Sequence, residues 1–456
     1  MSSKNFSLSG MPDLSSLEVK RREYVFSIVK NIFEKYGFFP LETPAIEKRE
    51  TLMGNYGSEG DKLVYQVLKS GDFFSKQDKK ELLKSDYKTI SSIISDKALR
   101  YDLTIPFARY VSKNQSDITF PFKRYQIQKV WRADRPQKGR LREFTQCDAD
   151  IIGSDSLWLE SDLLKIYDEV FRKLGLKDVV LKLNNRKILE GLYSNLSANF
   201  SFSEFCIVLD KIEKKGKDVF LDFLKENDIS RENILMFESL LINSISIDNL
   251  NPDFSSIVNI KNELIEEGKK EVVDLFSKIN RLETLKIEFD FSLARGLDYY
   301  TGMIFEIQCN DIDIGSIGGG GRYANLTTLF GNNIGSGVGI SFGVERILIC
   351  LDELNLFPKD LDCSLDLLFV NLGEEEAFLC QDYIDELRVS GIKCELFPDQ
   401  VKLKKQMSYA NKRGVKYTAL VGEKELKSKK ITLRNMIDGS QESITLKDLI
   451  NRLKND

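Results

Sequence analysis

Residues 120–153 constrain the fold more than any other part of the chain, because aromatic and charged residues alternate along them. Such alternation is typical of strands that bury one face, and it predicts two antiparallel strands at about 125–133 and 143–152. The loop between them, 134–142, is rich in positive charge. We therefore expect a pair of long strands joined by a basic loop.

One amphipathic helix is expected before this pair. Apolar residues recur at helical spacing between positions 21 and 36, and Gly37 is expected to end the helix. A strand follows and runs into Pro44, which cannot donate to a central ladder.

The sequence pattern changes three times further along the chain. Residues 195–283 are rich in Lys, Glu and Asn at helical spacing and predict an inserted helical subdomain. Short strands and tight turns then return, and a helix starts near Gly343. A separate α/β pattern begins after Pro358. We therefore divide the chain into a core in two parts, an insertion and a terminal domain: 1–194 and 284–358, 195–283, and 359–456.

The composition excludes several kinds of chemistry. The chain has 456 residues, enough for two or three domains, and contains no histidine. The lack of imidazole excludes Ser-His-Asp triads, Cys-His dyads and histidine-ligated zinc. The seven cysteines occur singly with no CxxC pair, which argues against a disulfide framework and a thiolate zinc site. Chemistry must therefore depend on carboxylates, arginines, tyrosines and metal ions.

Charge and hydropathy limit the expected partners. The net charge of -4 indicates no general affinity for nucleic acid, so any RNA site must be local. The N-terminus lacks the apolar core of a signal peptide, and no stretch of the chain is apolar enough to span a membrane. We therefore expect a cytoplasmic protein without a membrane partner.

A cluster of cations marks the loop between the two strands. Arginine suits phosphate because its planar fork is permanently charged and binds bidentately. A solvated basic hairpin is the alternative, but Arg132 adjoins Trp131, and Phe144 just past the loop could stack on a base. The cations are Arg132, Arg135, Lys138, Arg140 and Arg142.

Two glycine-rich segments follow the insertion. The first, 294–306, reads ARGLDYYTGMIFE and precedes the run GGGGRYANL, which lacks the GKS or GKT ending of a P-loop. Strand alternation would turn one of Tyr299 and Tyr300 inward. The second, GVGISFGVERI, places Arg346 in the first turn of a helix, where an anion would compensate its charge.

In chain order, these pieces resemble the three signature motifs of class II aminoacyl-tRNA synthetases: the helix and strand ending at Pro44, the Arg132 hairpin, and the strand and helix around Arg346. LRYDLT at 99–104 and ARGLDYYTG are similar to sequences peculiar to the histidyl-tRNA synthetase family. The resemblance covers the whole chain. It implies an α+β protein with an antiparallel-sheet catalytic core, a helical insertion and a C-terminal α/β anticodon-binding domain.

The resemblance also implies an activity: ATP-dependent activation of L-histidine and its transfer to the 3′ end of histidine tRNA, with Mg2+. Asp102, Thr104 and Gln146 would bind the histidine ammonium group. Asp150 and Tyr300 would hydrogen-bond the imidazole, while Tyr299 and Tyr323 would line the pocket.

For ATP, the resemblance implies a set of arginines and one aromatic ring. Arg132 would contact the α-phosphate and the substrate carboxylate, and Arg295 would reach the α-phosphate from the other side as the catalytic arginine. Arg140 belongs to the same ATP site. Phe144 would stack on adenine opposite Arg346, which would also hold the γ-phosphate. The chain departs from the usual motif residues at Trp131, Asp134 and Thr145.

Two features bear on macromolecular partners. Lysine clusters at 402–405, 412–416 and 424–430 suit single-stranded anticodon binding, although ordinary surface lysine is the alternative for each. The helix before Pro44 resembles the family's dimer-forming element, so a homodimer is expected, with a plain core helix as the alternative.

Two rival functions remain. A non-catalytic regulatory or tRNA-sensing paralogue is expected to lose motif arginines, whereas Arg132, Arg295 and Arg346 are all present. A class II synthetase for threonine, proline or glycine is disfavoured by LRYDLT and ARGLDYYTG.

Overall fold

The chain forms two compact units in this computed structural model: 22–356 make up most of the first and 357–456 most of the second. The structure describes residues 7–54, 56, 61–71, 86–242, 245–246, 254, 260–294, 300–324, 326–332, 334–362 and 365–455.

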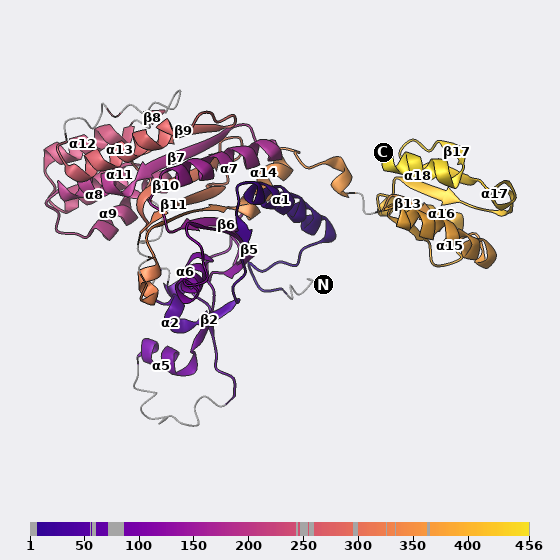
Figure 1. The fold of residues 1–456 in the computed structure, drawn as a ribbon, viewed down its shortest axis with the longest axis horizontal. Helices are drawn as coiled ribbons and strands as arrows, with labels where there is room; N and C mark the ends of the chain where they lie inside the picture. The colour runs from indigo at the N-terminus through magenta and orange to yellow at the C-terminus, as the bar shows by residue number, and fades with distance from the viewer. Residues whose placement is uncertain are drawn as a thin grey trace. The chain divides into compact units, whose positions relative to one another are not determined.

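A nine-stranded sheet forms the centre of the first unit (Figure 1). Only the β1–β5 and β7–β9 pairs are parallel, and the other neighbours are antiparallel. The long pair predicted from the sequence is confirmed as β5 and β6, with the first strand starting and ending slightly earlier than expected. In spatial order the strands are β1 (Phe39–Pro40), β5 (Phe122–Trp131), β6 (Glu143–Ile152), β12 (Gly337–Phe342), β11 (Gly318–Tyr323), β10 (Tyr300–Cys309), β7 (Val179–Asn185), β9 (Leu285–Phe289) and β8 (Ile245–Ser246).

Helices α1 (Ser16–Lys35) and α7 (Trp158–Leu174) pack through aromatic rings on one face of this sheet. Phe33 of α1 stacks on Tyr125 at 5.5 Å between ring centroids, and Tyr167 of α7 meets Phe342 edge-on at 4.8 Å. The predicted N-terminal helix is confirmed, and Gly37 follows it with φ +80°. Aromatic packing dominates this face, and the cavity described below lies on the other face.

A small subdomain that the sequence did not predict adjoins the large sheet. It contains a three-stranded sheet in the order β2–β4–β3. Tyr56, Tyr101, Ile105 and Tyr323 belong to one buried cluster that ties this subdomain to β11. Its elements are β2 (Ile46–Lys48), α2 (Arg49–Leu52), a 3-10 turn at Asp61–Leu63, β3 (Gln66–Val67), α5 (Tyr87–Ile94), β4 (Lys97–Leu99) and α6 (Thr104–Lys113).

Helices gather at the β7–β9 end of the sheet in Figure 1. Phe205, Phe220 and Phe237 pack edge-on around one another, with ring centroids 5.3 to 5.8 Å apart. The helical character expected for 195–283 is confirmed for the described helices between Phe202 and Ile242 and at Glu263–Ser277, while the domain boundaries stay a prediction. The helices are α8 (Arg186–Ser194), α9 (Phe202–Leu209), α10 (Ile212–Lys215), α11 (Asp218–Glu226), α12 (Arg231–Ile242) and α13 (Glu263–Ser277). After the glycine-rich strands come a 3-10 turn at Leu326–Phe330 and α14 (Val344–Glu353), the helix expected near Gly343.

The second unit is a five-stranded sheet in the order β14–β13–β15–β16–β17 with helices packed on it. The alternating strands and helices expected after Pro358 are confirmed, and the short α17 is an addition. The elements are β13 (Leu367–Phe369), α15 (Glu374–Val389), β14 (Cys394–Leu396), α16 (Leu403–Lys412), β15 (Tyr417–Leu420), α17 (Glu423–Ser428), β16 (Ile431–Asn435), β17 (Gln441–Ile444) and α18 (Leu446–Asn455), after a 3-10 turn at Lys359–Asp362.

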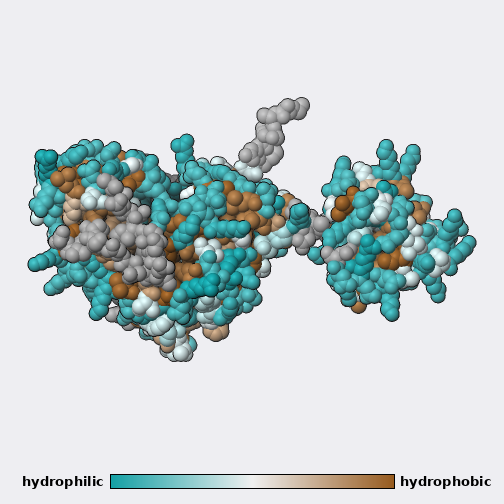
Figure 2. Space-filling model, turned by 90° about the horizontal axis from the view of Figure 1, so that it is seen from above, coloured by the Kyte–Doolittle hydropathy of each residue, from teal (hydrophilic) through white to brown (hydrophobic). Residues whose placement is uncertain are grey.

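Hydrophilic residues cover most of the visible face of each unit in Figure 2, and hydrophobic residues occur between them in small groups. Of the helices that the structure describes, none is both long and apolar enough to cross a bilayer.

Candidate functional site

The polar face of the large sheet is set by strand alternation along β6. Gln146, Asp148 and Asp150 fall on one side, because successive side chains point to opposite faces. Cys147 and Ala149 fall on the other side and are fully buried. Gly339 of β12 lies opposite Asp150, and a Cβ atom there would stand 2.1 Å from Asp150 Oδ1. The glycine-rich strand therefore makes room for a carboxylate.

A cavity of about 320 Å³ opens above this face. Tyr101, Asp102 and Thr104 come to it from the small subdomain, facing the residues of β6. The cavity brings together eight of the residues that the sequence predicted: Asp102, Thr104, Arg132, Gln146, Asp150, Tyr300, Tyr323 and Arg346.

Asp150 is held by two partners inside the sheet. Arg124, opposite it on β5, places Nη2 2.8 Å from Oδ2, and the Tyr323 hydroxyl donates to Oδ1 at 2.9 Å. Arg124 is itself fully buried, with its guanidinium 4.4 Å from the centre of the Phe107 ring. Burial raises the pKa of Asp150, while Arg124 and Tyr323 oppose that rise. The carboxylate is therefore fixed in position at the floor of the cavity.

Asp102 is the second buried carboxylate of the cavity. The Tyr56 hydroxyl donates to Oδ1 at 2.9 Å, and the Ile105 amide donates to the same oxygen at 3.3 Å. Burial raises the pKa of Asp102 to about 6, although both hydrogen bonds and Arg132 act in the opposite direction. A bound cation would favour its ionised form.

Arg132 stands immediately after β5, between two aromatic rings. Its Nε donates to the Tyr101 carbonyl at 3.0 Å, and its guanidinium lies 4.3 Å from the Tyr101 ring centre and 5.2 Å from that of Phe144. These contacts fix the plane of the guanidinium, as a bidentate anion contact requires.

A second cavity of about 250 Å³ adjoins the first. Arg132, Gln146, Ser341 and Arg346 line both cavities, so the two form parts of one site. Phe144 and Arg140, predicted as ATP contacts, line the second part.

The charged residues of the second part make ion pairs or hydrogen bonds with neighbouring residues. Arg140 pairs with Asp134 at 2.8 Å. Arg346 donates to the Ser316 carbonyl at 2.7 Å, so a backbone oxygen supplies part of the compensation expected for this arginine. The adjacent Glu345 is held by Arg22 of α1 through both carboxylate oxygens.

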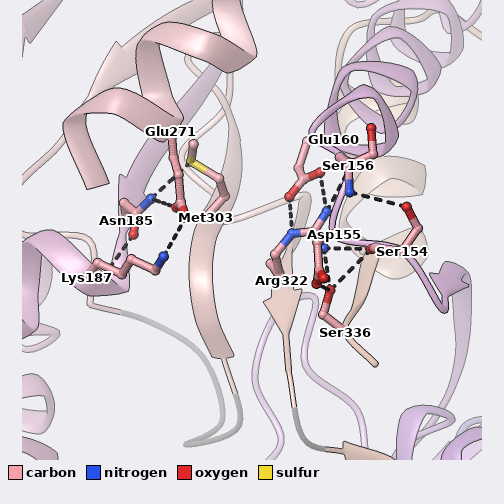
Figure 3. A network of polar contacts seen from close by, with 10 residues as sticks. All are labelled: Ser154, Asp155, Ser156, Glu160, Asn185, Lys187, Glu271, Met303, Arg322 and Ser336. Carbon is pink, nitrogen blue, oxygen red and sulfur yellow. Dashed lines mark hydrogen bonds and ion pairs between the residues drawn. The ribbon is translucent and has the colours of Figure 1, made fainter. Parts of the chain in front are cut away.

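Strand β11 is anchored from its opposite side by a buried ion pair (Figure 3). Arg322 donates to Glu160 of α7 at 2.5 and 2.6 Å, and also to the Ser336 hydroxyl at 2.7 Å. Tyr323, the next residue, points to the cavity side and reaches Asp150. The Arg322 network therefore sets the position of a site residue.

Arg295 and Tyr299 lie outside the described residues, so their predicted places in the site stay predictions. Sequence reasoning missed Tyr101, Asp148, Glu306 and Ser341, which line the first cavity, and Arg124, which pairs with Asp150. Asp148 could have been predicted from the sequence, because alternate residues of a strand share one face and Asp148 lies between Gln146 and Asp150.

The large sheet is mostly antiparallel, and its two-part polar site is lined by Arg132, next to the β5–β6 hairpin, and by Arg346, in the helix after a glycine-rich strand. Together with the α/β second unit, this arrangement defines the class II aminoacyl-tRNA synthetase fold. Within this class, the family model for histidyl-tRNA synthetase matches residues 94–347, and the model for the anticodon binding domain matches 366–456. The chain belongs to the histidyl-tRNA synthetase family.

Individual relatives agree with this assignment. The histidine–tRNA ligase of Christiangramia forsetii is 45% identical over 454 residues, which is 98% of each chain. That of Bacteroides fragilis is 45% identical over 450 residues, or 97% of this chain and 98% of the relative. The crystal structure of histidyl-tRNA synthetase from Nostoc sp. PCC 7120 matches with a TM-score of 0.79 at 26% identity, covering 99% of this chain and 100% of that one.

The fold alone is shared more widely. A Bacillus halodurans structure described as an ATP phosphoribosyltransferase regulatory subunit/histidyl-tRNA synthetase matches with a TM-score of 0.69 at 16% identity, covering 89% of this chain and 97% of that one. The expected α+β class, with its antiparallel catalytic sheet and α/β terminal domain, is confirmed.

Proposed function

We propose that the two-part cavity activates L-histidine with ATP and that the histidyl group is then transferred to the 3′ end of histidine tRNA. One observation carries this proposal: a pocket with buried carboxylates adjoins a pocket with arginines and Phe144, and Arg132 lines both. The reacting groups of an amino acid and of ATP would meet at this arginine.

The first part of the cavity suits histidine. Asp150, held by Arg124 and Tyr323, and Tyr300 present hydrogen-bonding groups to the imidazole, while Asp102, Thr104 and Gln146 receive the ammonium group. An analogue without ring nitrogens would leave Asp150 buried and without its ligand partner. Polar pockets of this kind reject such analogues strongly, by about 10⁴-fold or more.

The second part suits ATP. Phe144 and Arg346 sandwich the adenine, Arg346 also holds the γ-phosphate, and Arg140 adds positive charge. Arg132 contacts the α-phosphate together with the histidine carboxylate. Arg295, outside the described residues, completes the charge at the α-phosphate as the catalytic arginine, and Tyr299 lines the histidine pocket.

The reaction needs charge and alignment more than proton transfer. A carboxylate oxygen of histidine attacks the α-phosphorus, a new P–O bond forms, and the bond to pyrophosphate breaks with its electrons leaving on pyrophosphate. Fixed arginines stabilise the charge that develops on the phosphoryl oxygens. A chain without a single histidine can therefore carry out this step.

We propose that Mg2+ accompanies ATP in the second part of the cavity. It binds in nucleotide sites through one or two carboxylates together with substrate phosphates. Asp134 and Glu345 line this part, and across the described ranges no group of three or more acidic or thiol side chains could hold a metal. Because Arg140 pairs with Asp134 and Arg22 holds both oxygens of Glu345, we propose that the ion enters with ATP, bound mainly through the phosphates, whose charge it would neutralise.

The remaining assignments concern the rest of the molecule. We propose that the second unit binds the anticodon, with phosphate contacts from a lysine-rich hollow on α16 lined by Lys402, Lys404, Lys405 and Lys412. We further propose a cytoplasmic homodimer formed through α1, with 195–283 as an insertion in the catalytic core.

Pyrophosphate exchange tests the proposal. The purified full chain is assayed for ATP–pyrophosphate exchange with each of the twenty amino acids, alongside Arg132→Gln and Arg295→Ala. Exchange with histidine alone, lost in both variants, is expected. A folded chain that gives no exchange with any amino acid would support the regulatory paralogue instead.

A further inference from the structure

Asp148 is a buried carboxylate of the first cavity that the family-based roles leave unassigned. It is only 3% exposed and lines the cavity between Gln146 and Asp150 on the same face of β6. Gln126 of β5 and Ser341 of β12 flank it in the sheet register. Burying a carboxylate is costly unless a partner compensates it.

Three of the residues that line this cavity each have one buried side-chain oxygen atom with no hydrogen-bond partner within the part of the chain that the structure describes. These atoms are Asp102 Oδ2, Gln146 Oε1 and Asp148 Oδ1. Gln126 Oε1 shares this property, but Gln126 does not line the cavity. Buried polar atoms are almost always hydrogen-bonded, so three unsatisfied acceptors around one cavity indicate a ligand with donors.

An ammonium group has three N–H donors and no acceptor. The three oxygens equal these donors in number, and each can accept a hydrogen bond. Two of them belong to carboxylates, whose negative charge suits a cation. Building on the histidine-activating function proposed above, we propose that Asp148 is a binding residue for the α-ammonium group of the amino acid and completes a three-oxygen cage with Asp102 and Gln146. Thr104 then lies at the edge of this cage.

The charges around Asp148 agree with a cationic ligand. Burial raises the pKa of its carboxyl to about 7; Arg124 and a Ser341 hydrogen bond lower it, while Asp150 and Asp102 raise it further. Because Arg124 is already paired with Asp150, Asp102 and Asp148 face the cavity as two acidic groups. A bound ammonium group would stabilise the ionised form of both.

The test compares ligands with and without the ammonium group. Histidinol keeps the ammonium and imidazole groups, whereas 3-(imidazol-4-yl)propionate keeps the imidazole but lacks the ammonium. For the full chain and Asp148→Asn, we would measure the histidine KM and both inhibition constants in histidine-dependent pyrophosphate exchange. Asp178→Asn is the matched control, because its carboxylate lies at the surface, paired with Lys286.

In Asp148→Asn, the histidine KM and the histidinol inhibition constant should rise about 10- to 100-fold, the usual worth of a charged hydrogen bond. The constant for 3-(imidazol-4-yl)propionate and the KM for ATP should stay near wild type. Equal losses for all imidazole ligands, or no loss for histidine, would overturn the proposal.

The smaller Asp148→Ser gives the same comparison if the amide variant does not fold. Exchange by the unmodified chain is a separate result: its absence would contradict the proposed function, whereas a wrong ligand pattern in the variant would contradict only the role of Asp148.

Discussion

The stability of Asp148→Asn relative to the parent chain should increase as the pH rises towards about 7 and then level off. Burial raises the pKa of this carboxyl from 3.8 to about 7 in the folded chain. Between about pH 4 and pH 7 the folded chain therefore keeps a proton that the unfolded chain has released. The free energy of unfolding falls as pH rises through this window, and the loss levels off above it.

The size of the effect follows from the two pKa values. Between pH 5 and pH 8, the difference in proton binding by Asp148 between the folded and the unfolded chain lowers the free energy of unfolding by about 2–3 kcal/mol. An amide has no such proton equilibrium, so the stability of Asp148→Asn relative to the parent chain should grow by that amount over the same interval.

Tryptophan fluorescence during urea unfolding provides the assay. The chain has two tryptophans, Trp131 and Trp158, and both lie in the first unit, so the signal reports the unit that contains the site. Asp178→Asn should follow the parent curve at every pH. Parallel pH profiles for Asp148→Asn and the parent would refute the reasoning, because they would show that the buried carboxyl titrates alike in both states.

Three further substitutions test other contacts. Arg124→Met should lower the free energy of unfolding by about 3–5 kcal/mol in the same urea assay, because it leaves Asp150 buried without its cation; an unchanged midpoint would contradict this. Gly339→Ala should raise the histidine KM at least about 10-fold in pyrophosphate exchange with a smaller change for ATP, since its Cβ would clash with Asp150. Phe144→Ala should raise the KM for ATP about 10-fold or more, as expected for a lost base–aromatic stack, and leave the histidine KM near wild type. A larger effect on histidine than on ATP would place Phe144 in the other half of the site.

The sequence by itself determined the elements whose signals are local. Alternation fixed β5 and β6, helical spacing fixed α1, and glycine positions indicated where strands give way to turns and to α14. Motif resemblance supplied the candidate residues, and eight of the predicted side chains line the first cavity. These features depend on neighbours a few residues apart, so a single sequence records them.

Only the tertiary structure decided which distant residues meet. The three-stranded subdomain that carries Asp102 to the cavity has very short strands without a clear period, and its pairing joins segments tens of residues apart. The pairing of Arg124 with Asp150 follows from the register of β5 on β6. Asp102 and Asp148 line the same cavity because the small subdomain packs against the large sheet. A one-residue slip of that register would turn every β5 side chain to the other face. The partners of the buried charges were therefore settled by register and packing between elements, for which the local sequence pattern carries no signal.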